Sequence, residues 1–248
     1  MMKIVWTTVG LLIVGVLAGQ CMEGVMKFPE DSIQTAAGDL KIAFVGHGTL
    51  MLRWGQKVIH IDPVSREADY STMPKGDVIL VTHEHGDHLD AAAIEQVRKD
   101  DTIIIFTEKC AGAVKGGTVL RNGEKTEAAG IPVEAVPAYN IVHKRPSGEP
   151  FHPRGQGNGY VLTFGDTRLY VAGDTENIPE MKALADIDVG FLPMNLPYTM
   201  TPAMVADAAK AFRPKILYPY HYGETDTADL VRLLADEADI EVRIRPMK

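Results

Sequence analysis

The stretch Val78-Ile79-Leu80-Val81-Thr82-His83-Glu84-His85-Gly86-Asp87-His88-Leu89-Asp90 decides how this chain is interpreted. Its first four residues are an apolar, mostly β-branched run that predicts a buried strand. Three histidines and an aspartate follow within a few positions, and their side chains are ligands for zinc, iron and manganese. Packing or solvation explains a single histidine well, but it explains such a cluster poorly. The stretch therefore predicts a metal site at a strand end.

The spacing inside this loop predicts two groups of ligands. His83 and His85 are two residues apart, so they point the same way if the chain is extended. The glycine that follows lets the backbone turn, and Asp87 and His88 can then face a second position nearby. Asp90 is the expected N-cap of a helix that follows the loop.

The composition is that of one sizeable globular domain. A chain of 248 residues can bury a full core, and its 46% hydrophobic and 23% charged residues are ordinary proportions. The net charge of −8, without a basic tract, argues against a nucleic-acid partner. Cys21 and Cys110 form no Cys-x-x-Cys pair, so a metal site must use histidine and aspartate.

The N-terminal segment predicts export or membrane attachment. Lys3 is followed by an apolar stretch from Ile4 to Ala18, so residues 1–22 are expected to be a signal peptide or an N-terminal membrane anchor. The stretch is short for a membrane-spanning helix, which needs about 20 apolar residues, and a buried helix of the domain is the alternative. We expect residues 23–38 to be a linker and residues 39–248 to form the domain.

Two parts of the chain share one pattern. A hairpin leads to a strand that ends at Asp62, and a further strand then opens at Asp77. A second hairpin leads to a strand that ends at Asp174, and a further strand then opens at Asp188. This repeat predicts a duplicated β-rich half, with two sheets packed face to face and helices outside.

The spacing His83-x-His85-x-Asp87-His88 resembles the signature of the metallo-β-lactamase fold hydrolases. The resemblance is to the branch that includes proteins similar to L-ascorbate-6-phosphate lactonase and N-acyl-phosphatidylethanolamine phospholipase D. It covers most of the chain after about Asp39. It implies an α/β fold, the four-layer αββα sandwich of that family, with metals where the sheet edges meet.

The resemblance also implies the roles of residues outside the loop. Asp174 would bridge two metals, His221 would complete the second site, and Asp62 would accept a hydrogen bond from a ligand histidine. The expected metal ligands are His83, His85, Asp87, His88, His152, Asp174 and His221.

The sequence leaves two choices for the third histidine ligand of the first metal site. Many relatives place it directly after the strand that here ends at Ala138, where this chain has a tyrosine and an asparagine. The loop that follows carries His143 and His152, and we prefer His152 because Phe-His-Pro at this point resembles a sub-branch of hydrolases. His47 lies in a Gly-His-Gly turn, and the sequence is equally consistent with a functional role for it and with a turn histidine that has no catalytic role.

These residues predict a metal-dependent hydrolase with two divalent metal ions, expected to be zinc, with manganese or iron as alternatives. A hydroxide bound to both metals would attack an ester, lactone, amide or phosphodiester. Asp87 is the expected catalytic residue, which would orient the nucleophile or move its proton. A di-iron oxidoreductase and a non-catalytic binding protein on the same fold are the alternatives. His85 favours hydrolysis, because di-iron relatives usually have glutamate there.

The loop from Tyr139 to Arg154 is rich in positive charge and suggests an anionic small-molecule substrate. Arg145 and Arg154 would hold its carboxylate or phosphate, and a solvated loop is the alternative. Tyr198 follows another strand end and is expected to line the pocket. The sequence leaves the oligomeric state open.

Overall fold

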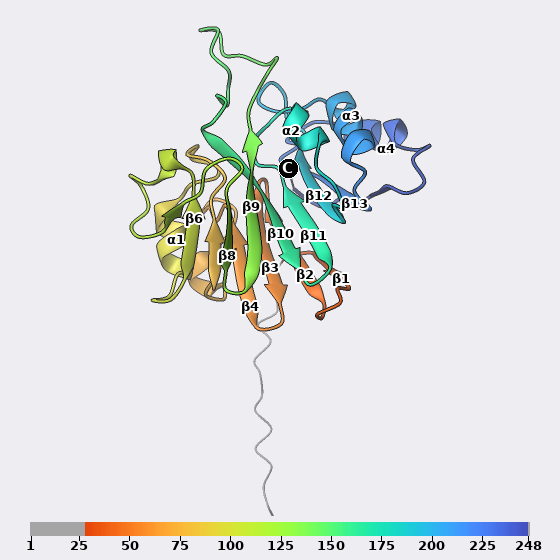
Figure 1. The fold of residues 1–248 in the computed structure, drawn as a ribbon. Helices are drawn as coiled ribbons and strands as arrows, with labels where there is room; N and C mark the ends of the chain where they lie inside the picture. Colours follow the sequence, from red (N-terminus) through yellow and green to blue (C-terminus); the bar gives the residue numbers. More distant parts are fainter. Residues whose placement is uncertain (1–27, 248) are drawn as a thin grey trace, which may run out of the picture.

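The computed structural model describes residues 28–247, and within them two seven-stranded sheets lie face to face (Figure 1). The expected signal peptide or anchor at residues 1–22 lies outside the described residues. No helix in the described range is both long enough and apolar enough to cross a membrane.

The first sheet has the strand order β1-β2-β3-β4-β5-β6-β7. Neighbours are antiparallel from β1 to β4 and parallel from β4 to β7. The strands are β1 (Glu30–Ile33), β2 (Leu40–Gly46), β3 (Thr49–Trp54), β4 (Lys57–Ile61), β5 (Val78–Leu80), β6 (Ile103–Phe106) and β7 (Thr118–Val119).

Strand β1 corrects the expected linker at residues 23–38 in its described part, from residue 28 onward. It pairs with β2 along its whole length, and Asp31 in its middle accepts hydrogen bonds from the Tyr218 hydroxyl and the Arg245 guanidinium. The strand is polar and partly exposed, because it forms the edge of the sheet. This polarity makes the segment look like a linker in the sequence, although it belongs to the folded domain.

The second sheet repeats the arrangement of the first, as the sequence pattern predicts. Its order is β14-β13-β12-β11-β10-β9-β8, with antiparallel pairs from β8 to β11 and parallel pairs from β11 to β14. The strands are β8 (Lys125–Ala128), β9 (Ile131–Ala138), β10 (Gly157–Phe164), β11 (Thr167–Val171), β12 (Val189–Pro193), β13 (Ile216–Tyr220) and β14 (Glu241–Val242).

Helices cover the outer faces of the sheets and complete the predicted four-layer α/β sandwich. They are α1 (Ala91–Val97), α2 (Pro179–Lys182), α3 (Pro202–Phe212) and α4 (Thr227–Leu233), with single turns of 3₁₀ helix at η1 (Tyr70–Thr72) and η2 (Glu108–Cys110). Helix α1 begins after the predicted cap Asp90, whose carboxylate accepts from the N–H groups of Ala92 and Ala93. Helices α2, α3 and α4 lie beside the second sheet (Figure 1), and Phe212 of α3 packs edge-on against Tyr170 of β11.

The position of β5 in the fold explains why the sequence from Val78 to Val81 is continuously apolar. Val78 and Leu80 pack in the core between the sheets, whereas Ile79 and Val81 pack under α1. Both faces are buried, as is usual for a strand inside a parallel arrangement. In both sheets the parallel strands end at the same edge, and the polar residues that follow these strand ends meet there.

Candidate metal centre

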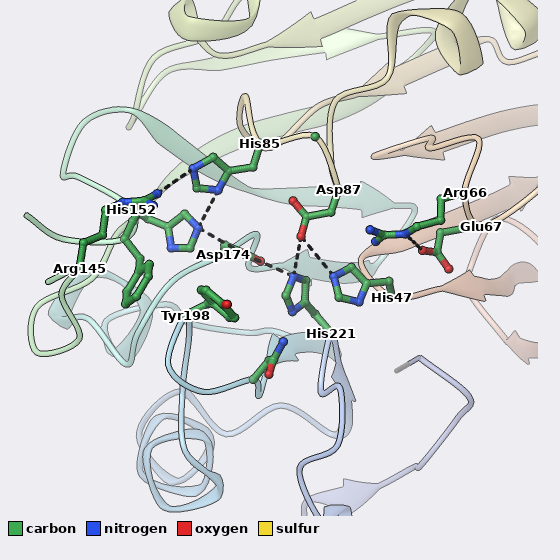
Figure 2. Close-up of a pocket in the computed structure, with 13 residues that line it drawn as sticks. His47, Arg66, Glu67, His85, Asp87, Arg145, His152, Asp174, Tyr198 and His221 are labelled. Carbon is green, nitrogen blue, oxygen red and sulfur yellow. Dashed lines mark hydrogen bonds and ion pairs between the residues drawn. The ribbon is translucent and has the colours of Figure 1, made fainter.

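Three histidines form a first group of possible metal ligands. His83 and His85 follow β5, and His152 comes from the loop between β9 and β10. The Nδ1 atom of His85 lies 3.2 Å from Nε2 of His83 and 3.2 Å from Nε2 of His152. Three nitrogens therefore converge on one point, and Figure 2 shows two of the three rings, those of His85 and His152.

A second group lies next to the first. It contains Asp87 and His88 from the same loop, His221 after β13, and His47 from the turn between β2 and β3. Asp87 Oδ2 is 3.6 Å from Nε2 of His221 and 3.3 Å from Nε2 of His47. The donor atoms of these four residues all lie within 4.8 Å of one another.

Asp174, which follows β11, lies between the two groups. Its Oδ2 is 3.3 Å from His152 Nε2 and 3.4 Å from His221 Nε2. Its Oδ1 is 3.4 Å from His88 Nε2. The structure thus brings all seven residues that the sequence proposed as metal ligands to one place, and it adds His47.

Asp62 and Thr82 hold two of the rings in a definite orientation. The buried carboxylate of Asp62 accepts hydrogen bonds from His88 Nδ1 at 2.8 Å and from the Thr82 hydroxyl at 2.6 Å. The same hydroxyl lies 3.0 Å from Nδ1 of His83 and accepts a hydrogen bond from its N–H group, since the hydroxyl itself donates to Asp62. Both rings then direct Nε2 at the centre, as metal-ligating histidines do.

The structure distinguishes between the two loop histidines. His152 lies beside His83 and His85, whereas His143 points its Nδ1 at Glu176 Oε1, 2.7 Å away. His143 is not in either group of possible ligands among the residues that the structure describes.

The geometry and the unpaired buried atoms fit divalent cations. Zinc–nitrogen bonds of about 2.0–2.1 Å at tetrahedral angles put neighbouring donor atoms about 3.3–3.4 Å apart, close to most of the separations above. Within the described residues, His88 Nε2, His221 Nε2 and Asp174 Oδ1 are buried without a hydrogen-bond partner. Buried polar atoms are costly without a partner, so these atoms fit a site for metal ions.

The electrostatics of the centre also suit a cation. Burial lowers the pKa of His83, and the neighbouring His88 lowers it further, so this ring is neutral and can donate its lone pair. Burial opposes the charge on Asp174, but the imidazoles of His221 and His88 hold its pKa well below the usual range. Burial likewise opposes the charge on His88, but Asp174 and Asp62 raise its pKa to about 9, so a bound cation would take the place of the proton on Nε2.

His47 is a site residue that the sequence only half indicated. It has a left-handed backbone with φ of 49°, which is uncommon for a residue with a side chain. Its ring centroid lies 3.7 Å from that of His221, and its carbonyl accepts a hydrogen bond from the N–H of His221. Gly48 beside it leaves room for the ring of His88, which would lie 2.6 Å from an added Cβ. The signal in the sequence was the Gly-His-Gly turn itself.

A cavity of about 660 Å³ opens over the candidate metal ligands. Arg145, Phe151 and Tyr198 line one side of it, as Figure 2 shows for Arg145 and Tyr198. The Arg145 guanidinium lies over the Phe151 ring, with Nη2 3.5 Å from Nε2 of His85. Arg154, the other arginine expected to bind substrate, is not brought to the cavity, because it pairs with Glu180 at 2.6 Å.

Comparison with known proteins agrees with this arrangement. A family model for the β-lactamase superfamily domain matches residues 41–221. A UPF0173 metal-dependent hydrolase of Pyrococcus horikoshii is 30% identical over 227 residues, covering 82% of this chain and 96% of that protein.

Solved structures show the same relationship. A protein from Parabacteroides distasonis, described as a metal-dependent hydrolase, is 52% identical, with a TM-score of 0.85 over 89% of this chain and 100% of that one. A metallo hydrolase from Ignicoccus hospitalis has a TM-score of 0.68 at 21% identity, covers 84% of this chain and 96% of that one, and shows the fold alone. The chain belongs to the metallo-β-lactamase superfamily and is a metal-dependent hydrolase.

Proposed function

We propose that the protein hydrolyses an ester, lactone, amide or phosphodiester bond in a small anionic substrate, at a centre of two divalent metal ions. The position of Asp174 carries this proposal. Its Oδ2 lies 3.3 Å from His152 Nε2 in the first group, and its Oδ1 lies 3.4 Å from His88 Nε2 in the second. A carboxylate that reaches both groups of donors could be shared by two cations.

The donor set suggests which residues hold each ion. His83, His85 and His152 would hold the first, Asp87, His88 and His221 would hold the second, and Asp174 would be shared. Zinc suits imidazole and carboxylate donors, and manganese and iron use the same ligands. When bound, two such ions supply Lewis acidity and lower the pKa of a water molecule to about 7.

Asp87 is the residue of the chain that would orient the attacking water. It lines the cavity, and 33% of its side chain is exposed, whereas Asp174 is buried. The ring of His47, 3.3 Å from Oδ2, limits how the Asp87 carboxylate can turn. A carboxylate held in this way accepts a hydrogen bond from water and directs its lone pair toward the substrate.

Arg145 supports an anionic substrate. It lines the cavity, and in the described part of the chain no carboxylate forms an ion pair with it. The two other arginines nearby are paired, Arg66 with Glu67 at 2.9 Å and Arg154 with Glu180 at 2.6 Å. An unpaired guanidinium beside a metal centre fits a carboxylate or phosphate of the substrate.

Elemental analysis of the purified protein, followed by a substrate screen, tests this function. We expect about two metal ions per chain and hydrolysis of at least one compound among nitrophenyl esters, lactones and bis-nitrophenyl phosphate. Chelation should abolish that hydrolysis, and zinc or manganese should restore it. Fewer than two ions per chain after incubation with both metals would contradict the dinuclear centre. Full loading with oxygen consumption and no hydrolysis would favour a di-iron oxidoreductase.

A further inference from the structure

A buried glutamate anchors the loop that carries His152. Glu176 follows β11 and is fully buried, with 0% of its surface exposed. Its carboxylate accepts hydrogen bonds from three consecutive backbone N–H groups, those of Ile141, Val142 and His143, each at 2.7 Å. Three N–H donors on one carboxylate match an ionised side chain that only accepts hydrogen bonds. The start of the loop is therefore fixed to the strand end that carries Asp174.

Asn140 connects this anchor to the third histidine. Its Nδ2 donates to Glu176 Oε1 at 3.1 Å and to the Tyr198 carbonyl at 2.8 Å. Its Oδ1 accepts from the backbone N–H of His152 at 2.9 Å and from Nδ1 of His152 at 2.7 Å. Glu176 has acceptors only, so it determines which end of the Asn140 amide faces it and which end faces His152.

The orientation of Asn140 determines what His152 presents to the centre. Since Nδ1 of His152 donates to Oδ1 of Asn140, the neutral ring keeps its lone pair on Nε2. That atom lies 3.2 Å from Nδ1 of His85 and 3.3 Å from Oδ2 of Asp174. The opposite tautomer would aim a proton at the two other donors and could not bind a cation.

We propose that Glu176 and Asn140 are positioning residues of the first metal site, which hold His152 in the place and tautomer that bind the metal. The inference rests on the proposed dinuclear centre. The loop from β9 to β10 projects beyond the sheets (Figure 1), and His152 lies outside both strands. A backbone hydrogen bond of 2.9 Å from the Asn140 N–H to the His152 carbonyl fixes the main chain there, but it leaves the direction of the ring to the side chains. Each ordered residue costs conformational entropy, and the buried pair provides the hydrogen bonds that offset it at this point.

Three variants test the proposal through metal binding by the full protein. Asn140→Leu has a similar volume and no hydrogen bonds, and we expect it to weaken one of the two zinc equivalents about 10- to 100-fold. Asn140→Asp keeps the acceptor for His152 but places a second carboxylate against Glu176, so it should weaken the same equivalent. The double variant Asn140→Asp with Glu176→Gln supplies an N–H group opposite the new carboxylate. It loses the acceptor for the His143 N–H at the same position, so it should recover part of the lost affinity.

The measurement is a zinc titration in competition with a chromophoric chelator, with thermal melting of the metal-free protein beside it. Asn158→Leu is the matched control, because this buried asparagine bonds to Asn122 and to the Leu120 carbonyl and not to a metal ligand. It should lower the melting temperature and leave both zinc affinities unchanged. If Asn140→Leu does not fold, Asn140→Asp and the double variant provide the comparison.

The possible outcomes separate this proposal from the dinuclear centre itself. Loss at one zinc equivalent in Asn140→Leu, with recovery in the double variant, supports the positioning role. Two unchanged zinc affinities in Asn140→Leu, or a double variant no better than Asn140→Asp, would overturn it and leave the centre intact. A wild-type protein that binds fewer than two zinc ions would instead contradict the proposed function.

Discussion

The first sheet supplies four candidate ligands from one loop, His83 to His88, whereas the second sheet supplies three from separate places, His152, Asp174 and His221. In the first case the loop is short and lies between a buried strand and a capped helix. In the second case each residue ends or follows a different strand, and one lies in a projecting loop.

The orienting groups differ in the same way. His88 is held by Asp62 at the end of the neighbouring strand β4, which pairs directly with β5. His152 is held by Asn140, which is held in turn by Glu176 from a different strand end. Ligands close together in the sequence need one neighbouring support, whereas a ligand delivered by a long loop needs a chain of supports.

Asp174→Asn is the strongest test of how the two sheets cooperate, because Asp174 contacts both groups of candidate metal ligands. Replacing the carboxylate removes the shared negative charge, so we expect metal content below about one ion per chain and a loss in kcat/KM of at least about 1,000-fold. Elemental analysis and kinetics measure both. Asp188→Asn, at the opposite end of the same sheet beside Arg168, is the control and should change neither. Loss of only one ion would mean that Asp174 serves a single site.

Arg145→Ala tests whether the projecting loop also recognises the substrate. Loss of the unpaired guanidinium should raise KM for an anionic substrate about 10-fold, equivalent to about 1.4 kcal/mol, and leave KM for a neutral analogue nearly unchanged. Arg154→Ala is the matched control, since Arg154 pairs with Glu180 away from the cavity. Equal increases for the anionic and neutral substrates would remove the anion-binding role.

His47→Asn has the smallest expected effect and tests whether the first sheet contributes more than its loop. Asparagine accepts a left-handed backbone well, so the turn should fold, but its side chain is too short to reach Asp87. We expect a loss in affinity for the second zinc ion of less than about 10-fold, with the first unchanged, by chelator competition. His143→Asn, which lies outside the second group of possible ligands, should leave the second affinity unchanged. If His47→Asn binds the second zinc ion as tightly as the wild type does, the first sheet contributes ligands only from the loop after β5.

The features that were predicted correctly from the sequence depend on residues near one another in the chain. The β5 strand, the Asp90 cap and the repeated hairpin-and-strand pattern each follow from local periodicity and capping chemistry. The paired sheets and the outer helices then follow from the repeat. The β1 strand looks like a linker in the sequence, because an exposed edge strand lacks the alternation of apolar and polar residues that marks a half-buried strand.

The sequence by itself predicted a metal site at the strand end after β5, because histidine and aspartate at this spacing have few other uses. Only the tertiary structure decided between His143 and His152, separated the unpaired Arg145 from the paired Arg154, and brought His47 to the site. The physical reason is that these positions depend on hydrogen bonds and ion pairs between residues distant in the chain. Such partners become neighbours only when the two sheets pack face to face.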